Sequence, residues 1–369
     1  MGNSMKVLVT GFTQNYGGVE AFVMNYYREM KKIDSSLVFD LLCYTEHPAY
    51  KKEFVAMGGN VYCVPSPKHP NCRKRVRSFF AQHGHEYSAI WCNKCDLHDI
   101  VFLKEASIVP KRIVHAHSSN IMASGLKKLL FIALHKINKA QIKKCATDYW
   151  ACSDWAARWI FPKQILENHC VQFIPNAIRL NDFAFTETIR KDYRQQLSLH
   201  GIVYGCVGRL NKIKNVTFVL QVFSRLWQSN HDSYLLVVGT GELENQLRME
   251  AGKLPGGDQI LFLGMRRDVP KLLQAMDCYL MPSLFEGFPV ASIEAQAAGL
   301  PVFAASGGIT PQAQLTDLFH FLPLSLGPEG WVKEILASDL TRKDRQDVLR
   351  EKGFDIQLAA NDLLNRLKE

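Results

Sequence analysis

Short runs of apolar, often β-branched residues recur along this chain, and several of them end in glycine, with helical patterns between many of the runs. The first run, 6–11, is followed by Gly17 and Gly18 and then by an amphipathic helical pattern over 19–30. This order of strand, glycine loop and helix is typical of an open α/β sheet that presents a helix N-terminus to a ligand. The loop lacks the GxGxxG motif, so a dinucleotide site is not predicted.

The same pattern continues in two series, which predicts two parallel sheets covered by helices on both faces. Further strands are expected at 38–43, 60–64, 89–92, 112–116, 148–151 and 171–174, and then at 202–207, 234–238, 260–263, 278–281 and 302–304. The polar stretch 181–200 is the candidate linker. We therefore expect an N-terminal domain, 1–177, a C-terminal domain, 178–354, and a closing helix, 355–369, that suits packing back on the N-terminal domain.

Composition indicates a globular protein with an anionic partner. The chain is 47% hydrophobic and 21% charged, with a formal net charge of +9, which suits nucleic acid, phosphorylated small molecules or an acidic membrane surface. Because the basic residues are not interleaved with aromatics as in a known recognition module, no nucleic acid is expected. No apolar run is long enough to span a bilayer.

The cysteines do not predict a metal or disulfide framework. Ten of them lie between Cys43 and Cys278 without regular spacing, and no signal peptide is recognisable, so a reducing cytoplasm is the expected compartment. Cys92 and Cys95 form one CxxC near His98, but no second pair completes a zinc site. Ordinary thiols and no metal are therefore expected.

Two basic stretches each have two interpretations. The stretch 68–80 places arginines and lysines next to Phe79 and Phe80, and the stretch 126–144 mixes leucine and isoleucine with six lysines. A basic amphipathic helix can lie on an anionic membrane surface, here the inner face of the plasma membrane. It can equally be a domain helix with a solvated lysine face, and the sequence leaves both open.

The stretch 281–300, MPSLFEGFPVASIEAQAAGL, is predicted to be a strand end, an acidic turn and a helix. Glu286 and Gly287 lie in the turn, Pro289 suits the first helical turn, and Glu294 falls inside the helix. Free N–H groups at a helix N-terminus can receive phosphate or sugar oxygens, and the two carboxylates can accept from a polyhydroxylated ligand. The plain alternative is a capped helix with a solvated Glu294.

Taken in order along nearly the whole chain, these residues resemble the family-4 retaining glycosyltransferases. The motifs that carry the resemblance are Gly17-Gly18-Val19-Glu20, His117, Pro175-Asn176, Gly208-Arg209, Lys214-Asn215, Gly239, Gly241, Gly264, Glu286-Gly287-Phe288-Pro289 and Glu294. The resemblance implies the GT-B fold, with two facing Rossmann-like domains and the active site in the cleft between them. The N-terminal domain would bind the acceptor and the C-terminal domain the nucleotide sugar.

The resemblance also implies roles for single residues. Arg209 and Lys214 would hold the donor diphosphate and stabilise the negative charge that develops as the anomeric bond breaks. Glu286 would lie at the donor sugar and Glu294 at the ribose hydroxyls. His117 matches a histidine at the donor sugar, although the neighbouring His115 leaves this assignment open. The remaining donor-binding residues would be Gly17, Gly18, Gly239, Gly241, Gly264, Met265, Gly287, Phe288, Pro289 and Val290.

The implied activity is retaining, metal-independent transfer of a sugar from a nucleotide sugar, with UDP as the expected nucleotide and no further cofactor. The acceptor would be a glycan or lipid-linked saccharide in the synthesis of bacterial capsule, exopolysaccharide or related surface glycans. The absence of any Asp-x-Asp motif agrees with metal-independent binding. Two alternatives stay open: a GT-B epimerase or phosphorylase, and a non-catalytic partner subunit with the same fold. The sequence does not identify the donor sugar, the acceptor, the linkage or the oligomeric state.

Overall fold

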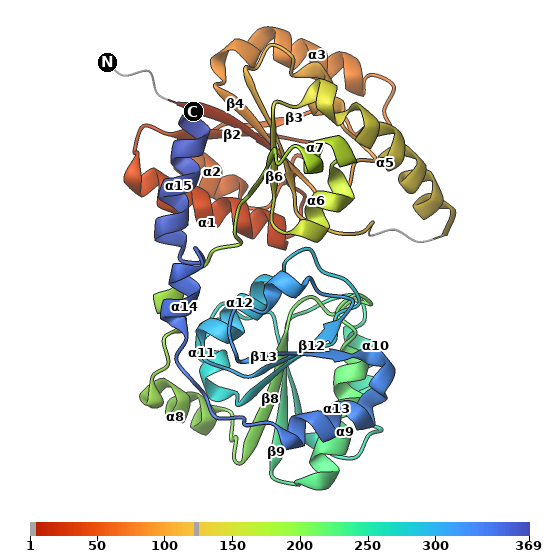
Figure 1. Cartoon of the computed structure of the whole chain (residues 1–369), viewed down its shortest axis with the longest axis vertical. Helices are drawn as coiled ribbons and strands as arrows, with labels where there is room; N and C mark the ends of the chain where they lie inside the picture. The colour runs from red at the N-terminus through yellow and green to blue at the C-terminus, as the bar shows by residue number, and fades with distance from the viewer. Residues whose placement is uncertain (1–4, 122–124) are drawn as a thin grey trace. The chain divides into compact units, whose positions relative to one another are not determined.

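A computed structural model describes residues 5–121 and 125–369, and the chain divides into two compact units (Figure 1). The first unit comprises Met1–Ala177 and Ile356–Glu369, and the second comprises Ile178–Asp355. Each unit is built on one parallel sheet with the strand order that the Rossmann fold uses. The prediction of two parallel α/β sheets is therefore confirmed.

The first unit has seven described strands in the order β3-β2-β1-β4-β5-β6-β7, all of them parallel to their neighbours. Its strands are β1 (Lys6–Thr10), β2 (Val38–Cys43), β3 (Val61–Cys63), β4 (Ala89–Lys94), β5 (Lys111–Ala116), β6 (Asp148–Ala151) and β7 (Val171–Phe173). Its helices are α1 (Gly18–Ile33), α2 (Lys51–Ala56), α3 (Cys72–His83), α4 (Val101–Glu105), α5 (Gly125–Cys145), α6 (Asp154–Ile160), α7 (Lys163–Glu167) and α15 (Ile356–Lys368), with a short 3-10 turn at Gly84–Glu86.

The second unit has six described strands in the order β10-β9-β8-β11-β12-β13. Its strands are β8 (Ile202–Val207), β9 (Ser233–Val238), β10 (Ile260–Gly264), β11 (Cys278–Met281), β12 (Val302–Ser306) and β13 (Phe319–Pro323). Its helices are α8 (Glu187–Gln196), α9 (Val216–Ser229), α10 (Glu244–Ala251), α11 (Val269–Ala275), α12 (Val290–Ala297), α13 (Gly327–Ala337) and α14 (Gln346–Glu351). Figure 1 shows α9, α10 and α13 on one face of this sheet and α8, α11 and α12 on the other.

The strand order reverses once in each sheet, and these points locate the candidate site. In the first unit the reversal lies between β1 and β4, and in the second between β8 and β11. Connections diverge on either side of such a point, which leaves a crevice outside the carboxyl ends of the two strands, where ligands bind in open α/β sheets. The loops that leave β1, β4, β8 and β11 are therefore the ones to examine.

Two details differ from the sequence prediction. The prediction missed β13, a five-residue edge strand that pairs only with β12 and ends at Pro323, whose ring leaves no N–H to donate. Helix α12 begins at Val290, so Pro289 is the N-cap residue and does not lie in the first helical turn. In both cases proline marks a boundary that the local pattern alone does not resolve.

The described residues show neither a metal-ligand cluster nor a disulfide, and all ten cysteines are free. His98 stacks on the ring of Phe131, with centroids 4.0 Å apart, and pairs with Asp96. Among the helices described, none is long and apolar enough to cross a membrane.

Helix α15 completes the core of the first unit although it comes last in the chain. Its residues Ile356, Leu363, Leu364 and Leu367 are buried in the same cluster as the apolar side of α1. Figure 1 shows the two helices side by side. The closing helix is thus an integral part of the first unit.

We expect Leu363→Ala to lower the free energy of unfolding by about 2–5 kcal/mol, because it empties a fully packed position in this cluster. Chemical denaturation followed by circular dichroism measures the change. Leu358→Ala on the same helix is the matched control, since Leu358 is exposed and its loss should change stability by less than about 0.5 kcal/mol. Equal effects of the two substitutions would contradict the packing of α15.

Candidate functional site

The loops that follow β8, β9 and β10 are tied together through their backbones. The N–H of Gly208 donates to the carbonyl of Val238 at 2.9 Å, and the N–H of Gly239 donates to the carbonyl of Gly264 at 2.8 Å. Gly239 has φ of 129°, and a Cβ there would lie 2.0 Å from the carbonyl oxygen of Gly208. Only glycine permits this approach. The packing of the two loops therefore explains why residue 239 is a glycine, whether or not a ligand binds there.

The two other candidate glycines of the second unit, Gly241 and Gly264, differ in what surrounds them. A Cβ on Gly241 would lie 2.3 Å from the carbonyl oxygen of Leu210, so Gly241 also serves close backbone packing. Gly264 has φ of 66° and open space around it, and Met265 next to it is 73% exposed. Gly264 and Met265 are therefore accessible to a ligand at the end of β10.

The loop between β8 and α9 brings Lys214 to Glu286. The side-chain oxygen of Asn211 accepts from the backbone N–H groups of Ile213 and Lys214, both at 3.1 Å, and so shapes the loop. Lys214 Nζ donates to Glu286 Oε1 at 2.6 Å, and both side chains are largely buried. The backbone N–H of Glu286 donates to the carbonyl of Gly308 at 2.8 Å, which anchors the acidic turn.

The turn before α12 is closely packed. Gly287, Phe288 and Pro289 are buried, and the Phe288 ring packs on Phe354 with centroids 5.4 Å apart. The carbonyl of Pro289 accepts from the hydroxyl of Ser292 at 2.7 Å. The first helical turn, which begins next to it at Val290, is therefore held in one orientation.

Glu294 is the second carboxylate of this region. No other described residue donates a hydrogen bond to its side chain, and burial raises its pKa to about 7, with Lys214 acting in the opposite direction. Glu294 is only partly exposed, and removing a carboxylate from water without hydrogen-bond donors is costly. Near neutral pH this group exchanges between its protonated and ionised forms.

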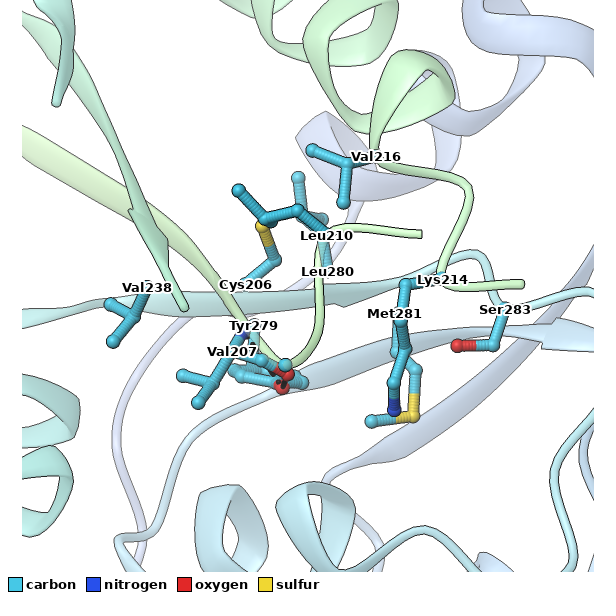
Figure 2. A pocket seen from close by; sticks show the side chains of 11 residues that line it. Cys206, Val207, Leu210, Lys214, Val216, Val238, Tyr279, Leu280, Met281 and Ser283 are labelled. Atoms are coloured by element: carbon cyan, nitrogen blue, oxygen red, sulfur yellow. Dashed lines mark hydrogen bonds between the residues drawn. The ribbon is translucent and has the colours of Figure 1, made fainter. Parts of the chain in front are cut away.

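A narrow cavity of about 20 Å³ lies at the reversal between β8 and β11 (Figure 2), with room for roughly one water molecule. Its lining residues are Cys206, Val207, Gly208, Leu210, Lys214, Val216, Val238, Tyr279, Leu280, Met281 and Ser283. The hydroxyl of Ser283 is buried without a hydrogen-bond partner among the described residues, and in Figure 2 it points to the side on which Lys214 and Met281 lie. The cavity is too small for a nucleotide. It lies between the carboxyl ends of β8 and β11.

Arg209 lies apart from the Lys214 group. Its side chain is 55% exposed, and Nε lies 3.4 Å from the carboxylate of Glu242, which is also exposed. Arg209 thus forms a surface ion pair and does not join Lys214 at the acidic turn. Because exposed pairs contribute only about 0–1 kcal/mol, little free energy opposes a reorientation of Arg209 toward an anion.

In the first unit, the ends of β1, β4 and β5 meet at Asn93. Its side-chain amide donates to the carbonyl of Thr10 at 3.1 Å, and its carbonyl oxygen lies 2.8 Å from His117 Nε2. Gly11, at φ of 104°, permits this contact, since a Cβ there would lie 2.4 Å from the backbone oxygen of Asn93. The orientation of the amide implies that His117 Nε2 carries the proton, which leaves Nδ1 as an acceptor.

The structure distinguishes the two neighbouring histidines. His115 is fully buried, accepts from the indole N–H of Trp91 at 3.3 Å and belongs to the core. His117 lies at the sheet edge and is partly exposed. Burial lowers the pKa of His117 to about 3, so its imidazole is neutral at physiological pH. Of the two, only His117 can meet a ligand.

Gly17 and Gly18 lie at the N-terminus of α1, as the sequence predicts. Gly17 is the N-cap residue, and three positions later the buried carboxylate of Glu20 accepts from the backbone N–H and the hydroxyl of Thr13, at 3.0 and 2.8 Å. Glu20 thus holds the glycine loop. The sequence interpretation named it within the motif but not as a site residue.

Asn93 and Ser283 were also missed as site residues. Both lie at the carboxyl end of a strand beside the reversal in strand order, and that position is the signal that could have found them.

Comparisons with known proteins bear on the family of the chain. The family described as Glycosyl transferases group 1 matches residues 189–315. The putative glycosyltransferase EpsF of Bacillus subtilis (strain 168) is 30% identical over 369 residues, which covers 95% of this chain and 93% of the relative. The chain belongs to the group 1 glycosyltransferases. The segment that the family matches contains Lys214, Glu286 and Glu294 of this glycosyltransferase.

Two further proteins are similar to this glycosyltransferase. The UDP-Gal:alpha-D-GlcNAc-diphosphoundecaprenol alpha-1,3-galactosyltransferase of Escherichia coli is 34% identical over 143 residues, 37% of this chain and 36% of that enzyme. The crystal structure of Anabaena HepE in complex with UDP-glucose has a TM-score of 0.71 and 18% identity, and covers 98% of this chain and 95% of that chain. The glycosyltransferase therefore has the GT-B fold, as the resemblance implied.

We expect the His117 ring of this glycosyltransferase to stay neutral between about pH 5 and pH 8, because burial disfavours the imidazolium. Two-dimensional NMR of the histidine side chains measures this, with His117→Gln used to assign the signal. A free histidine side chain titrates near 6.5. A midpoint near that value for His117 would contradict its burial against Asn93.

Proposed function

We propose that this glycosyltransferase moves a sugar, with retention of anomeric configuration, from a UDP-sugar to a glycan or lipid-linked saccharide in surface polysaccharide synthesis. The observation that carries the proposal is the Lys214–Glu286 pair beside Glu294 at the strand-order reversal of the second unit. The names of the relatives support the substrate class: one enzyme takes UDP-Gal and a diphosphoundecaprenol-linked sugar, and one structure holds UDP-glucose.

The donor diphosphate would lie against the turn before α12. The backbone N–H groups of Val290 and Ala291 have no acceptor within the helix and carry partial positive charge, whereas that of Ser292 donates to the carbonyl of Pro289 at 3.1 Å. Lys214 Nζ is already held at this turn by Glu286, so it needs little reorganisation to meet a phosphate oxygen. When the anomeric bond breaks, negative charge grows on the oxygen that leaves, and preorganised cations at that point lower the barrier. Arg209 would leave Glu242 to add a second cation.

Glu294 would accept hydrogen bonds from the ribose hydroxyls. Its side chain is partly buried, no described residue donates a hydrogen bond to it, and hydroxyl groups of a ligand would supply such donors. Gly264, Met265, Gly239 and Gly241 would line the path of the nucleotide. In the first unit, the N-terminus of α1 at Gly17 and Gly18 would approach phosphate, and the neutral His117 would accept from a sugar hydroxyl through Nδ1.

We also place the enzyme in the cytoplasm, peripheral on the inner face of the plasma membrane. A lipid-linked acceptor is held in a bilayer, so an enzyme that works on it gains from binding the same surface. The relative that acts on a diphosphoundecaprenol-linked sugar supports this placement.

The proposal is tested by incubating the protein with a panel of nucleotide sugars and following nucleotide release, with mass spectrometry of the products. We expect turnover with a UDP-sugar, and a loss of roughly 10²–10³-fold in kcat for Lys214→Ala and for Glu286→Ala, because each removes part of the charge arrangement at the leaving group. Arg225→Ala is the matched control, because it breaks a partly exposed ion pair with Glu329 elsewhere in the second unit.

The alternatives give different outcomes in the same assay. Absence of turnover with every nucleotide sugar would overturn the enzyme proposal and favour a non-catalytic subunit, whose cellular role would survive Lys214→Ala. A converted nucleotide sugar without any acceptor would favour an epimerase.

The raised pKa of Glu294 predicts the pH dependence of donor use. Because the ionised form accepts from the ribose, kcat/KM for the donor should rise as pH increases through about 7 and level off above it. The measurement is a pH profile of kcat/KM at limiting donor. In Glu294→Gln this rise should disappear, and kcat/KM at high pH should be lower than in the wild type. A profile that keeps its midpoint in Glu294→Gln would assign the ionisation to another group.

A further inference from the structure

Helix α5 has its polar side toward the protein. Within it, His135, Asn138 and Ile142 are the buried residues. His135 Nδ1 accepts from the backbone N–H of Leu97 at 3.0 Å, and the Asn138 amide donates to the carbonyl of Leu97 at 2.7 Å. Hydrogen bonds, together with the buried Ile142 and the stacking of Phe131 on His98, thus anchor this side of the helix to its unit.

The opposite side of α5 carries an exposed apolar row. Its members Leu126, Leu129, Leu130 and Ile137 are 85%, 64%, 57% and 57% exposed. Their spacing of three, four and seven residues puts them on one helical face. We call these four residues the α5 row. Single exposed leucines are ordinary on a protein surface, but a contiguous row of this kind marks an interaction site.

The charge around the α5 row has one sign. Helix α5 contains six lysines and no acidic residue over its 21 residues. Lys127, Lys136, Lys143 and Lys144 are exposed, and none of the four forms an ion pair with a described residue. The surface is therefore an apolar row with unneutralised positive charge, and it suits an anionic partner.

The other basic stretch of the sequence has a different character. In α3 the apolar residues Val76, Phe79 and Phe80 are buried in the protein. Arg73 and Arg77 both pair with the carboxylate of Glu105, at 2.5 and 2.9 Å. Helix α3 thus has no apolar residues to insert into a membrane, and half of its arginine and lysine charge is paired.

We propose that the α5 row docks on the surface of an anionic phospholipid bilayer. This inference rests on the proposed function in one respect, since a lipid-linked acceptor lies in such a bilayer. The leucines and the isoleucine would enter the boundary between headgroups and acyl chains, while the lysines beside them meet lipid phosphates. A second copy of the chain is a poor occupant, because two lysine-rich faces repel each other.

The test is sedimentation with vesicles of phosphatidylcholine alone and of phosphatidylcholine mixed with phosphatidylglycerol. We expect binding to the mixed vesicles only, weakened by added salt. The double variant Lys136→Glu/Lys143→Glu should lower the partition coefficient about tenfold or more. Leu129→Ser/Leu130→Ser should remove the part of the binding that resists salt.

The control is Lys74→Glu/Arg75→Glu on α3, which changes the net charge by the same amount at exposed positions. It should lower binding far less than the α5 charge variant. An equal loss in both, equal binding of wild type to the two kinds of vesicle, or no binding to either would overturn the proposal. A dimer in analytical ultracentrifugation that Leu129→Ser/Leu130→Ser abolishes would assign the row to a second copy instead.

Nucleotide release with a water-soluble acceptor separates this inference from the proposed function. The α5 variants should keep wild-type turnover in that assay, because none of the four residues belongs to the donor site. Normal turnover without vesicle binding would contradict the proposed docking surface and leave the proposed function standing. Vesicle binding without turnover would contradict the proposed function and leave the docking surface standing.

Discussion

The candidate site depends on the direct backbone contact between the loops that follow β8 and β9. The carbonyl oxygen of Gly208 occupies the space in which any side chain at Gly239 would begin. This contact sets the path of the β8–α9 loop, whose Lys214 side chain then passes over Gly208 toward Glu286. The position of the charged group is therefore held by main chain, which moves less than side chains do when a ligand arrives.

Desolvation affects the charged and titratable candidate residues of each unit. In the second unit, Lys214 and Glu286 offset each other's burial through a 2.6 Å hydrogen bond, whereas no described residue donates to Glu294 and its pKa rises to about 7. In the first unit, His117 shows the same effect with opposite sign, since burial keeps it neutral and leaves one ring nitrogen as an acceptor. Each unit, taken by itself, thus has a hydrogen-bond acceptor that a hydroxyl group of a ligand could donate to.

Two amphipathic helices of the first unit use their apolar faces in opposite ways. Helix α15 buries Leu363, Leu364 and Leu367 against α1, while α5 exposes Leu129 and Leu130 and buries His135 and Asn138. The residue spacing is helical in both, so the pattern predicts the helix but does not tell which face meets the protein. The hydrogen-bond partner of His135 and Asn138 is the backbone of Leu97, which lies in a loop far from α5 in the sequence.

The sequence alone determined the α/β class, most strand positions, the acidic turn and the family, because each depends on local spacing or on motifs within a few residues. It could not predict β13, whose short run ends at a proline. Only the tertiary structure decided that His117 and not His115 reaches the sheet edge, that Arg209 pairs with Glu242 at the surface, and that Lys214 meets Glu286. These contacts form between loops that the strand order brings together. Burial shifts the pKa of His117 and of Glu294, and it exists only once the sheets have formed.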